Sequence, residues 1–145
     1  MRIVLDTNVL VSGVLSPYGA PGEIVRMAAA DIVHICFDAR IISEYHTVLR
    51  RSKFKLDKEK ADVLLDQIES CGYLVAAEPA LYDLPDKDDE PFLEVAAAGE
   101  ADYLVTGNIK HYPVKKRQNV QVVTPGGFLQ EYRRKKVPIR SSRFL

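Results

Sequence analysis

The chain has 145 residues, 47% of them hydrophobic, and its equal numbers of acidic and basic side chains give no formal net charge. A chain of this length is near the usual size of one domain and buries roughly 70% of its unfolded surface, so it needs no disulfide or metal to fold. Cys36 and Cys71 lack CxxC spacing and ligand-spaced histidines, which argues against a zinc site or a redox motif. No apolar run approaches the ~20 residues of a membrane span, and an early Asp argues against a signal peptide. We therefore expect a cytoplasmic protein.

The neutral total conceals an uneven distribution of charge along the chain. Residues 1–109 carry 10 basic and 19 acidic side chains, whereas residues 110–145 carry 10 basic side chains and one acidic one. Such a split suggests an acidic site beside a basic arm, as expected where a protein handles cations and a polyanion together. The alternative is a solvated basic tail that folds over the acidic body or stays disordered.

Strand and helix patterns alternate along the chain. We expect strands at residues 2–6, 32–37, 73–76, 103–106 and 120–123, and helices at 8–15, 21–30, 39–51, 57–70, 89–99 and 128–136. This alternation predicts an α/β fold, an α/β/α sandwich with a mainly parallel central sheet of about five strands. Because the sequence shows no internal repeat or long linker, we expect one domain over residues 1–145, with a basic C-terminal segment from about 133.

Polar side chains are expected near the carboxyl ends of these strands. Asp6 ends the first strand, at the edge where open α/β sheets bind ligands, although a helix N-cap explains it equally well. Glu44 borders the apolar face of its helix, about 60° from Ile41 at ~100° per residue. Asp89 begins a helix and shares the face of that helix that points inward. Asn108 follows the fourth strand and is a weaker ligand than a carboxylate.

Each of these side chains alone is commonly structural, but together they suggest a metal site. Several carboxylates in one cleft repel one another unless a hard divalent cation neutralises them. Mg²⁺ takes oxygen ligands, and two such ions can activate a water and stabilise the leaving oxygen when a phosphodiester is cleaved. Combined with the basic arm, the pattern predicts a nuclease.

Five short motifs follow one another in a specific order. They are Leu5-Asp6-Thr7-Asn8-Val9-Leu10, Ser43-Glu44, Asp86-x-Asp88-Asp89-x-x-Phe92-Leu93, Ala101-Asp102-Tyr103-Leu104-Val105-Thr106-Gly107-Asn108 and Thr124-Pro125-x-x-Phe128-Leu129. With them the chain resembles PIN-domain ribonucleases over residues 1 to about 132, and most closely the VapC-like subgroup of toxins in toxin–antitoxin pairs. The resemblance implies a Mg²⁺- or Mn²⁺-dependent endoribonuclease that is usually a homodimer and is often inhibited by a partner antitoxin.

The resemblance also implies a set of site residues. The acidic positions of the family map onto Asp6, Glu44 and Asp89, with Asn108 in place of the fourth acid. Our hypothesis is that Asp6 and Asp89 hold the principal ion and that Glu44, also a metal ligand, orients a bound water. Asn108 would contribute a neutral oxygen or a substrate hydrogen bond, and it opens a Thr-Gly-Asn-x-x-His pattern that occurs in the toxin-like subgroup. Two further acids are held in reserve: Asp86 and Asp102.

The expected contacts to RNA surround these residues. They are Thr7, Asn8, Thr106, Lys110, Lys115, Lys116 and Arg117. The basic ones follow the strand before Asn108 directly and are suited to phosphate contacts. His111 would either meet a phosphate or be plainly exposed. The basic residues 133–136 would either fold back or serve a partner.

Two other classes of protein are compatible with parts of this pattern. A catalytically weak or inactive domain of the same fold would bind RNA or a partner protein, and Asn108 favours it. A phosphoacceptor domain, either a receiver or a haloacid-dehalogenase-like phosphatase, also places an Asp after its first strand. The phosphatase needs a second Asp where this chain has Asn8, and the receiver needs a Lys where it has Val123-Thr124-Pro125. We therefore expect a metal-dependent endoribonuclease with RNA, an antitoxin and a second copy as partners, and no membrane.

Overall fold

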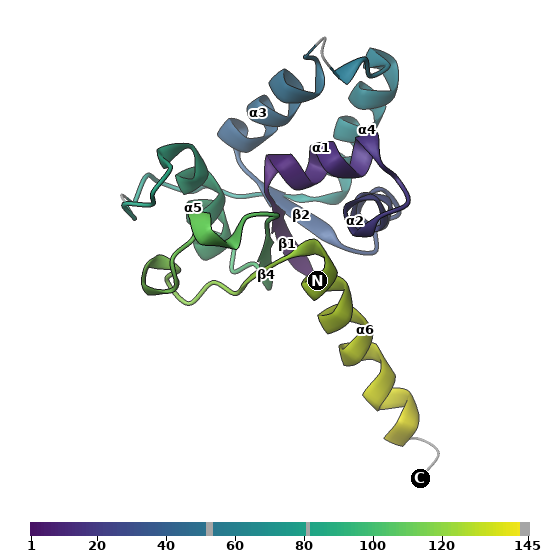
Figure 1. Ribbon diagram of the computed structural model, residues 1–145, viewed down its shortest axis with the longest axis vertical. Helices are drawn as coiled ribbons and strands as arrows, with labels where there is room; N and C mark the ends of the chain where they lie inside the picture. Colours follow the sequence, from purple (N-terminus) through teal and green to yellow (C-terminus); the bar gives the residue numbers. More distant parts are fainter. Residues whose placement is uncertain (52–53, 81, 143–145) are drawn as a thin grey trace.

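The computed structural model describes residues 1–51, 54–80 and 82–142, and within them one parallel sheet organises the chain (Figure 1). The strands are β1 (Arg2–Leu5), β2 (His34–Phe37), β3 (Tyr73–Leu74), β4 (Tyr103–Val105) and β5 (Val122–Val123), in the order β3-β2-β1-β4-β5. The predicted parallel sheet of about five strands is confirmed. All five strands are shorter than expected, β1 and β4 by one residue and β2, β3 and β5 by two.

The first strand lies at the centre of the sheet. Ile3 pairs with Ile35 of β2 on one side and with Tyr103 of β4 on the other. Its apolar run is buried on both faces, with Ile3, Val4 and Leu5 fully inaccessible. After β1 the chain builds one half of the sheet and then crosses back to build the other half. Ligands bind at such a switch point, outside the carboxyl ends of the strands, so β1 and β4 deliver their following residues to a natural site.

Helices cover both faces of this sheet, which confirms the predicted sandwich. The helices are α1 (Thr7–Leu15), α2 (Ala20–Ala29), α3 (Ala39–Leu49), α4 (Lys58–Cys71), α5 (Glu90–Ala98) and α6 (Pro125–Ser142), with short 3-10 turns η2 (Lys87–Asp89), η3 (Ile109–His111) and η4 (Val114–Lys116). Helix α5 packs across β1, β2 and β4, and helices α1 to α4 pack against one another on the other side (Figure 1). Within the described residues, no helix has both the length and the apolar character required to cross a bilayer.

Aspartates start several of these elements. The carboxylates of Asp38 and Asp57 accept backbone hydrogen bonds at the beginnings of α3 and α4. Asp86 does the same for η2, which leads directly into α5, and the Oδ1 of Asp86 accepts from the Asp88 amide at 2.9 Å. Asp89 makes no such cap bond. The capping duty therefore falls on Asp86 and leaves the carboxylate of Asp89 free for another use.

The C-terminal helix is longer than expected and begins at Pro125 instead of residue 128. Two glycines in its first turn hid this start, but the Thr124 hydroxyl accepts a hydrogen bond from the Gly127 amide at 3.0 Å and caps the helix. The helix extends away from the sheet (Figure 1). Its basic side chains fold back in part, since Arg133 pairs with Glu23 of α2 at 2.7 Å.

Candidate metal centre

A polar pocket of about 200 Å³ opens where β1 ends and α5 begins. It is lined by Asp6, Thr7, Asn8, Glu44, Val48, Arg51, Asp86, Asp88, Asp89, Phe92 and His111. These residues come from separated parts of the chain, which the parallel sheet brings together at the carboxyl ends of its strands. The three acids that the sequence singles out, Asp6, Glu44 and Asp89, are all among them.

Asp6 is held at the floor of the pocket by hydroxyl groups. It is 5% exposed, and its Oδ2 accepts hydrogen bonds from the Thr106 hydroxyl at 2.9 Å and the Tyr112 hydroxyl at 3.4 Å. Its Oδ1 accepts from the Asn8 amide at 3.3 Å, so Asp6 also caps α1. Burial and then the charge of Asp6 raise the pKa of Tyr112, so the phenol keeps its proton and serves as a donor. Asp6 thus both caps α1 and lines the pocket.

Glu44 reaches the pocket from α3. Its Oε2 accepts a short hydrogen bond from the Thr7 hydroxyl. The next residue, Tyr45, is fully buried and donates its hydroxyl to the Leu5 carbonyl at the end of β1. This contact fixes the position of α3 beside β1, and Glu44 therefore lies beside the segment that carries Asp6.

Asp89 is the acid with the most unusual environment. It is 8% exposed, and among the described residues no group donates a hydrogen bond of good geometry to its Oδ2. Burial raises the pKa of Asp89 to about 6, and the negative charge of Asp6 adds to this rise. The nearby imidazole of His111 opposes the rise. A buried carboxylate of this kind is costly to ionise and gains from a cation.

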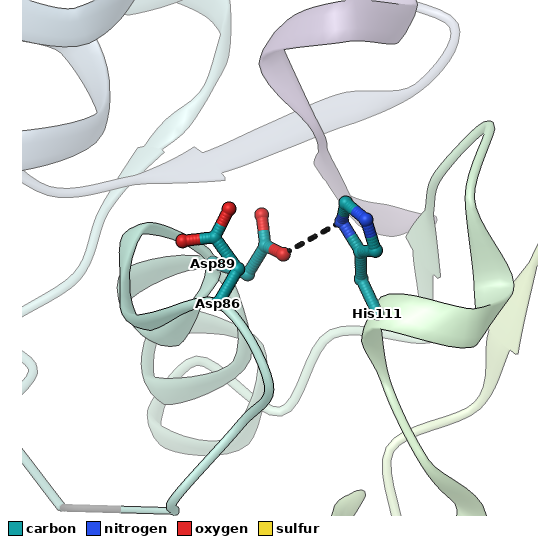
Figure 2. Close-up of side chains that lie close together, drawn as sticks. All are labelled: Asp86, Asp89 and His111. Atoms are coloured by element: carbon teal, nitrogen blue, oxygen red, sulfur yellow. Dashed lines mark ion pairs between the residues drawn. The ribbon is translucent and has the colours of Figure 1, made fainter.

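His111 lies between Asp89 and Asn108. Its Nδ1 is 2.9 Å from Asp89 Oδ2, and its Nε2 is 2.8 Å from the Asn108 side-chain amide nitrogen. Figure 2 shows the imidazole near the carboxylates of Asp86 and Asp89, with a dashed line for its ion pair with Asp89. One ligand atom from each of these three residues lies within 4.8 Å of the other two. The tightest potential ligand group among the described residues therefore contains Asp86, a reserve acid, and His111, whose role the sequence left open.

Several predicted residues lie away from the pocket or play a different part. Asp102 precedes β4 and accepts a hydrogen bond from the Arg2 amide at 2.9 Å. It therefore lies at the opposite end of the sheet, where β1 and β4 begin. Thr106 is fully buried behind Asp6, and Thr7 is engaged with Glu44, so both support acids of the site. Asn108 does not line the pocket, but its side chain contacts His111, which does.

The predicted basic contacts are divided between exposed and engaged side chains. Lys110 and Lys115 are exposed. Lys116 binds the Asp83 carbonyl at 2.6 Å and its carboxylate at 3.1 Å, and the Arg117 guanidinium donates to the Tyr112 carbonyl at 2.7 Å. Lys116 and Arg117 therefore hold the segment after β4 in place.

The sequence reasoning missed three residues near the acids. Tyr112 follows a run of polar residues, and only its burial shows that it supports Asp6. Arg51 lines the pocket from just after the end of α3, and the expected helix over 39–51 would have placed it two turns after Glu44. Asp88 also lines the pocket, and the sequence shows it only as part of the motif around Asp89.

The donor set fits a hard divalent cation. Carboxylate oxygens are the ligands that Mg²⁺ and Mn²⁺ prefer, and Asp6, Glu44 and Asp89 all line the pocket. Among the described residues, the ligand atoms that lie within 4.8 Å of one another are those of Asp86, Asp89 and His111. Asp89 supplies a buried carboxylate whose negative charge such an ion would compensate. The residues present are therefore compatible with a metal centre.

Comparisons with known proteins agree with this arrangement. A crystal structure of VapBC2 from Rickettsia felis bound to a DNA fragment from their promoter contains a chain with the same fold, at a TM-score of 0.57 and 22% identity over 86% of this chain and 98% of the other. No curated protein matches. A family model described as PIN domain matches residues 2–110, which is most of the sequence. The chain therefore belongs to the PIN-domain family.

Proposed function

We propose that this protein is a metal-dependent endoribonuclease that hydrolyses RNA phosphodiester bonds. The observation that supports this most strongly is Asp89, a buried carboxylate whose pKa is raised by burial, facing a pocket shared with Asp6 and Glu44. A protein that only needed a stable core would gain by replacing such a residue with an apolar one. A buried Asp89 is expected if its carboxylate holds a cation.

Asp6, Asp89 and Glu44 are the residues that would hold Mg²⁺ or Mn²⁺. When bound, such an ion activates a water and stabilises the leaving oxygen of the cleaved phosphodiester. The chain itself orients the ligands: hydroxyls of Thr106 and Tyr112 fix Asp6, and the Thr7 hydroxyl fixes one oxygen of Glu44. Glu44 can then present its other oxygen to the attacking water and accept a proton from it.

Contacts to the RNA would come from the rim of the pocket. Arg51 lines it, and the exposed Lys110 and Lys115 follow β4 on the adjoining turns. Basic side chains of this kind bind phosphates without reading the base sequence. Asn8 is exposed beside Asp6 and can donate to a phosphate oxygen.

We further propose that the protein is the toxin of a toxin–antitoxin pair, with an antitoxin and a second copy of itself as partners. The support is the shared fold with a chain of VapBC2, together with the sequence motifs of the toxin-like subgroup. Co-expression with the product of a neighbouring gene, followed by co-purification, tests the antitoxin. Light scattering of the purified chain tests the dimer.

The cleavage experiment uses a generic single-stranded RNA with Mg²⁺, Mn²⁺ or EDTA. We expect metal-dependent cleavage by the parent chain and its loss in Asp6→Asn, with the fold retained as judged by circular dichroism. Unchanged cleavage by a highly purified Asp6→Asn variant would contradict the proposal. Asp102→Asn is the matched control, since it makes the same change at the other edge of the sheet.

The second candidate is a weak or inactive domain that binds RNA or protein. Asn108 favours it, because a neutral amide that contacts His111 stands where the family has its fourth acid. RNA binding without cleavage by the parent would support this alternative. A gain of cleavage in Asn108→Asp would show that the amide restrains an otherwise complete site.

A further inference from the structure

His111 has the position of a metal ligand, although the acidic positions of the family do not include it. It extends from η3, the turn after β4, and places Nδ1 2.9 Å from the buried Oδ2 of Asp89. Asp86, Asp89 and His111 each offer a ligand atom within 4.8 Å of the other two. Ligands at ~2.1 Å from an octahedral ion lie about 3 Å apart when adjacent and about 4.2 Å apart when opposite. The 2.9 Å between Nδ1 and Oδ2 thus matches two adjacent ligands of one ion, and Asp86, within 4.8 Å of both, needs a small rotation of its side chain to join them.

The Asp89 oxygen gives independent reason to place a cation here. Its side chain is about nine-tenths buried, and the imidazole of His111 faces its Oδ2 with Nδ1 2.9 Å away. Acidic clusters on surfaces are common without ions, but a buried carboxylate is costly to ionise unless a positive charge stands beside it. A cation shared by Asp89 and His111 would satisfy both groups.

Asn108 is suited to orient the imidazole for this purpose. A histidine that binds a metal through one ring nitrogen usually donates the hydrogen on the other nitrogen to a carbonyl or carboxylate. The Asn108 side chain lies 2.8 Å from Nε2, and a rotated amide would offer its carbonyl oxygen to the Nε2 hydrogen. The same amide can donate to a neutral Nε2 when Nδ1 carries the hydrogen. Asn108 can therefore hydrogen-bond to Nε2 whichever ring nitrogen carries the hydrogen.

We propose that His111 is a metal ligand through Nδ1, together with Asp86 and Asp89, and that it makes this centre select Mn²⁺ over Mg²⁺. The inference rests on the proposed metal centre and specifies its preference. Imidazole nitrogen suits transition-metal ions, whereas Mg²⁺ requires hard oxygen ligands and keeps several waters. A purely carboxylate pocket would discriminate less between the two ions.

The test measures binding of the metal ions alone to the full chain, without RNA. Mn²⁺ and Mg²⁺ are titrated by calorimetry into the parent, His111→Gln and His46→Gln. His46 is the matched control, because it is also partly exposed but lies on α3 facing Glu69, with its Nε2 3.7 Å from Oε1. We expect His111→Gln to weaken Mn²⁺ binding by at least about tenfold and Mg²⁺ binding by much less, so that the selectivity falls. His46→Gln should leave both affinities unchanged.

A second measurement does not depend on any variant. Electron spin echo spectroscopy of Mn²⁺ bound to the parent should show coupling to a ¹⁴N nucleus. Mn²⁺ binding without that coupling would overturn the assignment of His111, as would equal weakening of both ions in His111→Gln. If Asp6→Asn abolishes binding while His111→Gln changes nothing, the metal centre stands and this inference fails. Absence of any binding to the parent would overturn both.

Discussion

The direction in which a carboxylate presents its oxygens is set by the hydrogen bonds behind it. Thr106 donates to Asp6 Oδ2, and the same hydroxyl accepts a hydrogen bond from the Asn108 amide at 3.1 Å. One buried side chain thus links the end of β1 with the turn that carries Asn108 and His111. Groups that orient metal ligands commonly contribute 10- to 100-fold, roughly, to metal affinity.

We therefore predict that Thr106→Val weakens divalent metal binding by about tenfold or more. The substitution keeps the shape of the side chain but removes its donor and acceptor. Titration of Mn²⁺ by calorimetry measures the effect. Thr124→Val makes the same change at the cap of α6 and should cost about 1 kcal/mol of stability with no loss of metal affinity. Equal metal affinity in the two variants would contradict this role of Thr106.

A second prediction concerns the stability of the metal-free protein as a function of pH. The pKa of Asp89 is raised to about 6, so the folded state holds its proton more tightly than the unfolded chain does. The stability that this proton provides is fully present below the unfolded pKa of about 3.9 and is lost as pH rises through about 6. Asp89→Asn removes the penalty, and at pH 8 it should be more stable than the parent by at most about 3 kcal/mol.

Thermal unfolding in EDTA at pH 4 to 8 measures this difference, which should shrink as the pH falls below 6. Asp66→Asn on the exposed surface of α4 is the control and should show no such trend. A less stable Asp89→Asn at pH 8 would mean that the ion pair with His111 outweighs the burial of the carboxylate.

Spacing along the chain predicted some of the site and could not predict the rest. Asp6, Glu44 and Asp89 meet because strand ends and helix faces follow from hydrophobic periodicity. The role of Thr106 depends on which side of the strand end it faces, and that of His111 on η3, a three-residue turn without a sequence signature. Asp102 lies on the far edge because it precedes β4, a consequence of the parallel direction of the strands.

At the scale of elements, α1 and α2 pack closely because glycine lies at their contact. A Cβ built on Gly13 of α1 would come within 2.7 Å of the Pro21 carbonyl oxygen of α2, and one on Gly22 would overlap the Pro17 carbonyl oxygen in the segment that joins the two helices. Backbone atoms cannot yield as the end of a flexible side chain can. The two helices can therefore stay in contact only while these positions lack a side chain.

We expect Gly22→Ala to destabilise the protein by about 1–3 kcal/mol, as overpacking does elsewhere. Chemical denaturation measures the change. Gly126→Ala is the matched control, because a Cβ there meets nothing within 4 Å in the first turn of α6. That variant should be neutral or up to about 1 kcal/mol more stable, since Ala favours a helix. A neutral Gly22→Ala would show that the segment joining α1 and α2 can shift away from Gly22 without cost.

Periodicity predicted the order and type of the elements but not all of their ends. Helices α3 and α4 match expectation closely, because their apolar faces repeat over three turns. The start of α6 was missed because Gly126 and Gly127 disfavour a helix locally, and the Thr124 cap that offsets them acts through the folded backbone. Strand ends depend on pairing partners that lie far away along the chain, as with Ile3 and Tyr103.

At the scale of the whole molecule, the basic C-terminal part divides into a fixed and an exposed portion. Lys116 and Arg117 bind the protein itself, whereas Lys110 and Lys115 face solvent on the turns after β4. The charge imbalance of the sequence therefore overstates the positive charge available to a polyanion. Only the exposed side chains can release counterions from RNA.

We predict that Lys110→Gln combined with Lys115→Gln lowers the slope of log K against log salt for single-stranded RNA binding by about 1.4, or ~0.7 for each phosphate that the protein no longer neutralises. Fluorescence anisotropy over a range of salt concentrations, with Ca²⁺ to suppress cleavage, gives this slope. Lys58→Gln on α4 is the control and should leave it unchanged. A slope unaffected by the double variant would place the RNA elsewhere.

The central position of β1 has a consequence for how the protein is made. The first strand leaves the ribosome long before β4, the neighbour that completes its pairing, and before Thr106 and Tyr112, which hold Asp6. A growing chain that ends at α4 contains Asp6 and Glu44 but neither Asp89 nor His111. On the proposed function, a nascent chain would therefore be inert toward RNA until about three quarters of it has emerged, and a prematurely terminated one would stay inert.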